Sequence, residues 1–209
     1  MKKYSPEWTP VFGAIYFWVA MDKNKRIAVM INNNWGWIPK AVLTLPNIDS
    51  LMNELICYIW GESKIEKFIS YPRYLNNYNG GFNLDMLSYW YHKKIDRIKI
   101  INNLKKELAE GKNNSDAYIA VNRGFFFYEA LDGYNEGDDY PIGPEGVYKE
   151  KTKKGDYFRF LQPTIYGNIE DIPEELREVI AVSETLDFTK NRLLDNNLIS
   201  SYFSRTYKN

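Results

Sequence analysis

VFGAIYFWVAMDKNKRIAVMI, residues 11–31, is the stretch of sequence that decides the fold. Two runs within it, Val11–Met21 and Arg26–Ile31, are rich in β-branched and aromatic residues, which favour strands. The polar residues between them, Asp22 to Lys25, have the chemistry of a turn. The stretch therefore predicts a β-hairpin that supplies the first two strands of a sheet.

Helical periodicity dominates two of the segments that follow. Apolar residues recur at three- and four-residue spacing over 48–60, with Asn47 as the expected N-cap and Gly61 as a stop. A longer apolar stripe covers 84–108 and follows a second capping residue, Asn83. This stripe spans about seven turns and predicts one long helix.

The remaining segments predict further strands and helices. Residues 117–121 and 124–130 favour strands, and 157–164 favours another. A short helix is expected from residue 171, where Pro173 and nearby acids suit a helix N-terminus. The tail, residues 187–202, is expected to be helical.

The order of these elements indicates the fold class. Strands arrive in runs of two with helices between them, rather than in strict β-α-β alternation. We therefore expect one α+β domain over residues 1–209, with an antiparallel β-sheet covered by helices and one long central helix.

Charge and residue counts exclude several classes of function. Lys plus Arg and Asp plus Glu number 27 each, so the basic excess of a general nucleic-acid binder is absent and nucleic acid is an unlikely partner. The chain has one cysteine, Cys57, and one histidine, His92, too few for a zinc site or an internal disulfide. Phosphate-binding loops and nucleophile motifs are also missing. We expect no catalytic constellation, no metal site and no cofactor.

The N-terminal apolar run does not predict a membrane segment. Its eleven residues, Val11–Met21, are fewer than the roughly 20 that span a bilayer. No small-residue cleavage site follows, so a signal peptide is also disfavoured. Together with the single cysteine, this predicts a cytoplasmic protein.

An acidic loop is the first candidate functional feature. Six acids fall between residues 128 and 147 without a single Lys or Arg among them. They are Glu129, Asp132, Glu136, Asp138, Asp139 and Glu145. The spacing matches no EF-hand loop. The alternatives are a solvated loop, a partner-binding surface, and a site of metal binding or acid–base chemistry. Loops of this length are more often functional than short ones.

Two tryptophans form the second candidate feature. Trp35 and Trp37 flank Gly36 in a loop that also contains Pro39. They have the chemistry to stack on a sugar or nucleobase, to anchor a partner, or to cap one end of the core.

Several of these segments together resemble the immunity proteins of bacterial polymorphic toxin systems, including those of contact-dependent inhibition. The resemblance is carried by the hairpin at 17–30, the Gly/Pro loop at 34–39, the aromatic strand at 123–128 before the acidic loop, and the segments 157–163 and 172–175. In the first turn this chain has Asn24 where the pattern has Gly, and Asn tolerates left-handed backbone.

The resemblance implies a cytosolic protein that binds and neutralises one cognate toxin and has no catalytic residues of its own. Many such toxins are basic nucleases, which an acidic loop would attract. Two other functions stay open. One is an enzyme that uses loop carboxylates on a sugar or nucleotide, and the other is a nucleic-acid module using Lys93, Lys94 and Arg97.

Overall fold

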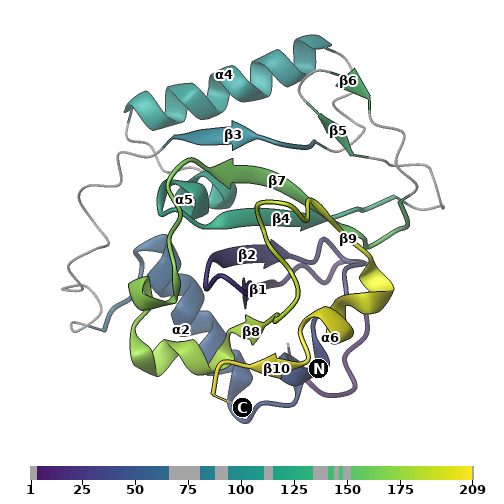
Figure 1. Ribbon diagram of the computed structural model, residues 1–209, viewed down its shortest axis with the longest axis vertical. Helices are drawn as coiled ribbons and strands as arrows, with labels where there is room; N and C mark the ends of the chain where they lie inside the picture. The colour runs from purple at the N-terminus through teal and green to yellow at the C-terminus, as the bar shows by residue number, and fades with distance from the viewer. Residues whose placement is uncertain are drawn as a thin grey trace.

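The computed structural model describes residues 4–65, 81–87, 94–110, 115–133, 141–143, 146–147 and 152–208. Within them an eight-stranded mixed sheet has the order β10-β8-β1-β2-β4-β7-β3, and β9 pairs with β7 (Figure 1). Its strands are β1 (Phe17–Met21), β2 (Ile27–Ile31), β3 (Phe82–Leu84), β4 (Phe126–Ala130), β7 (Tyr157–Pro163), β8 (Ala181–Val182), β9 (Leu193–Leu194) and β10 (Arg205–Thr206). A separate two-stranded sheet contains β5 (Ile142–Gly143) and β6 (Gly146–Val147).

Helices and 3-10 turns connect and cover these strands. The α-helices are α1 (Lys40–Leu43), α2 (Ile48–Trp60), α4 (Lys94–Glu110), α5 (Asp116–Asn122) and α6 (Ile199–Tyr202). The 3-10 helices are η2 (Ile169–Asp171), η3 (Glu174–Val179) and η4 (Asn196–Leu198). The α+β class predicted from the sequence is confirmed. In the described part of the chain no helix has the length and apolarity needed to cross a membrane.

The predicted hairpin is confirmed and lies at the centre of the sheet. Strands β1 and β2 pair antiparallel, with Phe17 opposite Ile31 and Met21 opposite Ile27. The first strand is shorter than predicted, because residues 11–16 lie outside it. In the connecting turn Lys25, rather than Asn24, has the left-handed backbone conformation, with φ of 63°.

The expectation of an antiparallel sheet was wrong, because two of its pairings are parallel. β1 runs parallel to β8, and β2 runs parallel to β4. Parallel neighbours need a long crossover connection, and the chain between β2 and β4 supplies one through α1, α2, α4 and α5. Residues 117–121 belong to this crossover. They form α5 instead of the predicted strand, because the Ser115 side chain accepts the Tyr118 amide and begins a helix there.

The expectation of a long central helix was also wrong. The helix does not begin at residue 84, and it does not lie at the centre of the fold. Residues 82–84 form β3 and pair with β7, so Asn83 lies opposite Gln162 and caps no helix. α4 begins at Lys94 within the described residues and lies beyond β3, at the far end of the molecule from β10 (Figure 1). Ile95 and Ile98, which belong to the predicted apolar stripe, are 60% and 45% exposed.

Helix α2 has the bounds predicted for it, although its N-terminus is not capped in the predicted way. Gly61 ends the helix in the left-handed conformation, as expected of a C-terminal glycine. Asn47 lies just before the helix with φ of 56° and makes no side-chain capping bond. Asn47 therefore contributes a left-handed turn between α1 and α2, which few residue types tolerate.

The tail predicted to be helical over 187–202 is mostly not helical. It contains a loop, β9 and the 3-10 helix η4, and within it only Ile199–Tyr202 form an α-helix. The reason is tertiary, because the Phe188 amide donates to Asp22 and the carbonyls of Phe188 and Asn191 accept from Arg159 and Tyr128. The segment crosses one face of the sheet instead.

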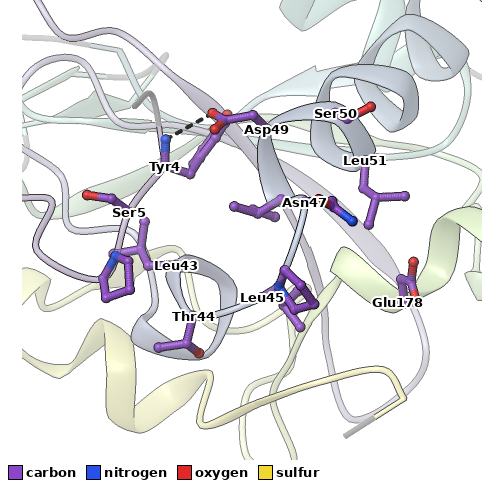
Figure 2. Close-up of a pocket in the computed structure, with 13 residues that line it drawn as sticks. Tyr4, Ser5, Leu43, Thr44, Leu45, Asn47, Asp49, Ser50, Leu51 and Glu178 are labelled. Atoms are coloured by element: carbon purple, nitrogen blue, oxygen red, sulfur yellow. Dashed lines mark hydrogen bonds between the residues drawn. The ribbon is translucent and has the colours of Figure 1, made fainter. Parts of the chain in front are cut away.

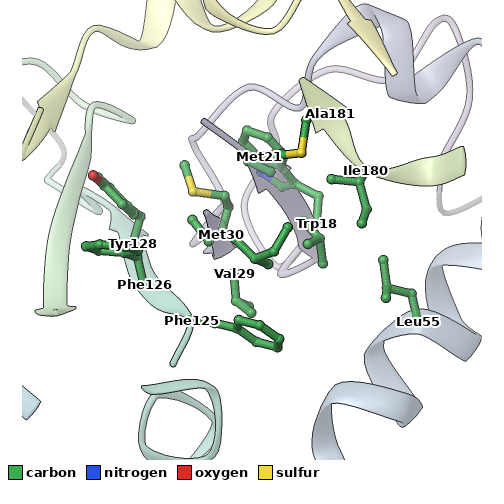
Figure 3. Packing of buried hydrophobic residues seen from close by; sticks show 14 of the residues in the cluster. Trp18, Met21, Val29, Met30, Leu55, Phe125, Phe126, Tyr128, Ile180 and Ala181 are labelled. Atoms are coloured by element: carbon green, nitrogen blue, oxygen red, sulfur yellow. The ribbon is translucent and has the colours of Figure 1, made fainter. Parts of the chain in front are cut away.

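Both faces of the sheet are buried by different parts of the chain (Figure 3). On one face Phe17 packs edge-on against Trp60 of α2, with ring centroids 5.3 Å apart. Its neighbour Trp18 points to the opposite face and packs edge-on against Phe203 at 5.2 Å. Successive residues alternate across a strand, so α2 covers one face and the C-terminal segments cover the other.

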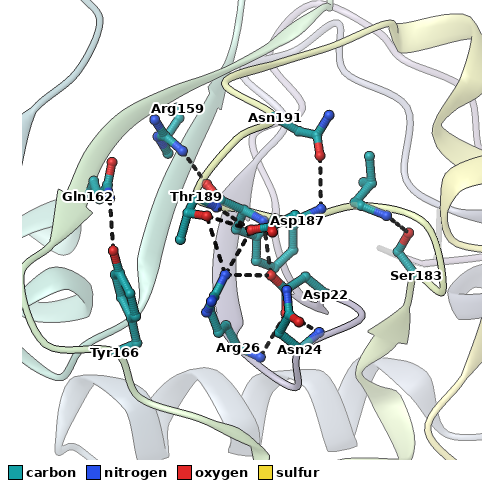
Figure 4. A network of polar contacts seen from close by, with 12 residues as sticks. Asp22, Asn24, Arg26, Arg159, Gln162, Tyr166, Ser183, Asp187, Thr189 and Asn191 are labelled. Carbon is teal, nitrogen blue, oxygen red and sulfur yellow. Dashed lines mark hydrogen bonds and ion pairs between the residues drawn. The ribbon is translucent and has the colours of Figure 1, made fainter.

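A buried polar network fastens the C-terminal segment to the hairpin turn (Figure 4). The fully buried Asp22 carboxylate accepts the amides of Asn24, Arg26 and Phe188, each at 2.9 Å. The guanidinium of Arg26 lies 2.8 Å from the Asp187 carboxylate. Burial alone would raise the pKa of Asp187, but hydrogen bonds from Thr189 and the charge of Arg26 lower it.

A neighbouring arginine extends this network across the sheet. The Arg159 guanidinium of β7 contacts the Asp85 carboxylate at 3.0 Å and donates to the Phe188 carbonyl. The buried Tyr128 hydroxyl donates to the Asn191 carbonyl at 2.5 Å. Charged and polar groups are therefore paired where the covering segment crosses β4 and β7.

We predict that Asp22→Ala strongly destabilises the fold, because it leaves three backbone N–H groups without their acceptor. The expected loss is about 3–5 kcal/mol in the free energy of unfolding, measured by urea denaturation. Glu184→Gln is the control, since the exposed Glu184 pairs with Arg205 at the surface and its loss costs about 0.5 kcal/mol or less. Equal effects of the two substitutions would contradict a structural role for Asp22.

Candidate functional site

Four segments leave the sheet at one edge, and they contain three of the described candidate residues, Trp35, Trp37 and Asp132. Because β2 and β4 are parallel, with Ile31 opposite Glu129, both strands end at this edge. The antiparallel partners β1 and β7 begin there. The segments are residues 11–16, 32–37, 131–133 and 152–156, and we call their surface the strand-end edge. Sequence reasoning proposed the Trp loop and the acidic loop separately, and the fold places the Trp loop beside residues 131–133, where the acidic loop begins.

Asn32 fixes the N-terminal segment against the end of β2. Its fully buried side chain donates to the Ala14 carbonyl at 3.0 Å and accepts the Tyr16 amide at 2.6 Å. The backbone amide of Asn32 also donates to the Tyr16 carbonyl at 3.1 Å. One asparagine therefore extends the pairing of the hairpin beyond the last residue of β2.

Asn34 connects the N-terminal segment to the acidic loop. Its side-chain oxygen accepts the Gly13 amide at 2.8 Å, and its side-chain nitrogen donates to Asp132 at 3.2 Å. Asn33 donates to the Ala130 carbonyl at 3.2 Å. Both asparagines have positive φ, at 41° and 71°, which Asn tolerates better than other side chains do. The sequence alone indicated no role for these three asparagines.

The structure places two of the six predicted acidic residues. Asp132 is exposed at the strand-end edge and held by Asn34. Glu129 is half-buried in β4, two residues before the strand leaves the sheet. Glu136, Asp138, Asp139 and Glu145 lie outside the residues whose side chains the structure describes.

Glu129 has an unusual environment for a carboxylate. Its neighbours across the sheet are Ile31 of β2 and Phe158 of β7, both apolar. Burial raises its pKa from 4.5 to about 7. Within the described ranges no group of three or more acids, histidines or cysteines has a geometry that would hold a metal ion. A carboxyl group with a pKa near neutrality has the property needed for general acid–base chemistry.

Trp35 lies beneath a lysine at the strand-end edge. The ammonium of Lys154 is 3.2 Å from the centroid of the Trp35 ring, a cation–π contact that covers one ring face. The Trp35 carbonyl accepts a hydrogen bond from the Asn196 side chain at 3.1 Å. Its indole N–H is buried and has no hydrogen-bond partner among the described residues.

Trp37 closes one end of the core rather than projecting from it. Its ring packs edge-on against the buried Trp8, with centroids 6.2 Å apart. Its amide donates to the Asn196 side chain at 2.7 Å, and its carbonyl accepts from the Tyr157 hydroxyl at 3.0 Å. Asn196 therefore holds both tryptophans of the loop through their backbone, and no sequence pattern indicated this role.

A groove of about 700 Å³ lies elsewhere on the molecule (Figure 2). The segment around Tyr4, the connection between α1 and α2, and Glu178 of η3 line it. Tyr4 donates its amide to Asp49 at 3.1 Å, which fixes one wall. None of the predicted site residues lines this groove, so it and the strand-end edge are separate surfaces.

The remaining reactive and basic residues add no site to the described part. Burial raises the pKa of the Cys57 thiol, which disfavours the reactive thiolate. His92 and Lys93 lie outside the described residues, as does the side chain of Lys94. Arg97 is only 7% exposed, so it does not contribute to a basic surface for nucleic acid.

Comparisons with known proteins give no relative: no family model, no curated protein and no solved structure matches the chain.

The raised pKa of Glu129 predicts a pH-dependent stability. A carboxyl group whose folded pKa exceeds its unfolded value stabilises the fold at low pH, and this contribution is lost as pH rises through about 7. Glu129→Gln should therefore be more stable than the wild type by about 2 kcal/mol at pH 8 and nearly equal to it at pH 4, below the ordinary pKa of 4.5. Urea denaturation at the two pH values measures this difference. The same stability difference at both pH values would contradict the raised pKa.

Proposed function

We propose that this protein is a cytoplasmic immunity protein that binds and neutralises a cognate toxin through the strand-end edge. One observation carries the proposal: the parallel pairing of β2 with β4 brings the Trp loop and the start of the acidic loop to one edge. The resemblance of the hairpin and of the segments at 34–39 and 123–128 to immunity proteins supports the same function.

The charges of this edge support a basic partner. Asp132 is exposed, and no Lys or Arg occurs from Glu129 to Val147. The nearby Lys153 pairs with Asp195 at 3.3 Å, and Lys154 lies over Trp35. Acidic groups on such a surface accelerate encounter with a positively charged protein and oppose encounter with acidic ones.

The backbone of this edge supports binding without large rearrangement. Asn32 and Asn34 fix residues 13, 14 and 16, and Asn196 fixes the Trp loop. Surfaces that are already ordered lose little conformational entropy on association. A rigid edge of this kind suits tight inhibition of one partner.

The first test is binding to the product of the neighbouring upstream gene. We expect the two proteins, expressed together, to co-purify as a complex, and we expect this chain to abolish the toxicity of that product in cells. If the upstream product is no toxin, or if it does not bind, the proposed function is wrong.

A second prediction concerns the electrostatic contribution of Asp132. Asp132→Asn keeps an oxygen that can accept the Asn34 hydrogen bond and removes only the charge. We expect the association rate with the toxin to fall about two- to five-fold at low ionic strength, and the difference to vanish at high salt. Stopped-flow or surface-plasmon measurements report this rate. Glu184→Gln is the matched control, because Glu184 is an exposed acid that follows β8 at the opposite edge.

Glu129 favours a second candidate function, that of an enzyme using a carboxyl group. Its pKa of about 7 would allow proton transfer near neutral pH. The stacking platform expected from Trp35 and Trp37 is largely occupied, by Lys154 on one ring and Trp8 on the other. Hydrolysis of a sugar or nucleotide that is lost in Glu129→Gln, with toxin binding intact, would establish this alternative.

A further inference from the structure

Three of the exposed large apolar side chains lie within five residues of the chain. Val11, Phe12 and Ile15 are 44%, 69% and 52% exposed. Sequence reasoning placed all three in the first strand, whereas the structure places them before β1, at the strand-end edge. Exposed aromatic and aliphatic groups this close together are uncommon away from interaction surfaces.

A tight turn presents Phe12 to solvent. The Ala14 amide donates to the Val11 carbonyl at 3.1 Å, which closes a four-residue turn. Gly13, the third residue of this turn, has φ of 83°. Glycine adopts this left-handed conformation without strain. A Cβ at Gly13 would meet no atom within 4 Å, so the surface around the turn is open.

The turn is held rigidly from below. Asn34 accepts the Gly13 amide, and Asn32 binds the Ala14 carbonyl and the Tyr16 amide. Ala14 itself is buried, with 7% exposure. Phe12 is thus an exposed aromatic ring on an ordered backbone, which matches the aromatic residues that dominate the energetics of protein interfaces.

The turn also adjoins the acidic loop. Asn34 accepts from Gly13 with one side-chain atom and donates to Asp132 with the other, so one side chain separates the two segments. The surface therefore combines an apolar projection with the first exposed acid of a segment that carries no positive charge up to Val147.

We propose that Val11, Phe12 and Ile15 form an apolar anchor that inserts into an apolar pocket rimmed by Lys or Arg on the partner protein. This inference rests on the proposed function and names the part of the edge that holds the toxin. Charge complementarity selects this occupant. In a second copy related by a two-fold axis, Asp132 beside the turn would face its own equivalent, and the same exposed acid opposes binding to an anionic membrane.

The anchor and the acids have separate kinetic roles. Apolar anchors at the centre of an interface are desolvated in the complex and determine the dissociation rate. Charges such as that of Asp132 act earlier and determine the association rate. Loss of the Phe12 ring should therefore accelerate dissociation and leave association nearly unchanged.

The test measures binding of the upstream gene product to Phe12→Ala and Ile15→Ala by calorimetry and surface plasmon resonance. We expect Phe12→Ala to weaken binding by about 30-fold or more, and Ile15→Ala by about 5- to 10-fold, through faster dissociation. Ile165→Ala is the matched control, because Ile165 is 51% exposed and follows β7 at the opposite edge. We expect wild-type affinity for this control and unchanged thermal unfolding for all three variants.

Each other outcome overturns the anchor. Wild-type affinity in Phe12→Ala and Ile15→Ala shows that the turn is outside the interface, while the proposed function stands. Failure of the wild type itself to bind refutes the proposed function and the anchor with it. The wild type could also self-associate or bind anionic vesicles. If Phe12→Ala abolishes either of these, the turn binds a second copy or a membrane and not the proposed partner.

Discussion

The parallel pairing of β2 with β4 is the constraint on which the rest of the structure depends. Parallel strands cannot be joined by a tight turn, so the chain must cross over, and the crossover includes α2 and α5, which pack on the sheet. The same pairing makes both strands end at one edge. The helical covering layer and the strand-end edge are thus two consequences of one pairing, between strands that lie about 100 residues apart in sequence.

The two edges of the sheet are organised differently. At the edge opposite the strand-end edge, the carboxylates of Asp22 and Asp187 are paired with Arg26 and with backbone amides, and they fasten the covering segment to the hairpin turn. At the strand-end edge, asparagines fix the backbone, and acidic and apolar side chains remain exposed around it. The first arrangement adds stability, whereas the second holds an ordered surface available for contact.

Sequence reasoning succeeded where structure is determined locally. The hairpin and α2 depend on periodicity and on turn or stop residues such as Gly61, which a short window contains. It failed where contacts with residues distant in sequence determine the secondary structure. Residues 82–84 pair with β7 as a strand, and residues 187–192 bind the face of the sheet instead of forming a helix. The acids and tryptophans of the candidate site were visible as residue types. The position of Asp132 beside the Trp loop was not visible, since it follows from long-range pairing. Phe12 was missed because periodicity assigns residues 11–21 to one strand. The role of Asn32 and Asn34 was missed because it depends on contacts with residues 13–16 and 132 that only the fold creates.

Three features at or next to the strand-end edge do not stabilise the fold. Glu129 lies between apolar neighbours that raise its pKa, which costs folding energy at neutral pH. The buried indole N–H of Trp35 has no hydrogen-bond partner among the described residues, and Phe12 is 69% exposed on a turn that five hydrogen bonds keep in place. At the opposite edge the buried carboxylate of Asp22 has its partners. Departures from local stability concentrate where a protein performs its function, and here three of them occur where four chain segments converge. This asymmetry supports the proposal that the strand-end edge is the surface that binds the partner.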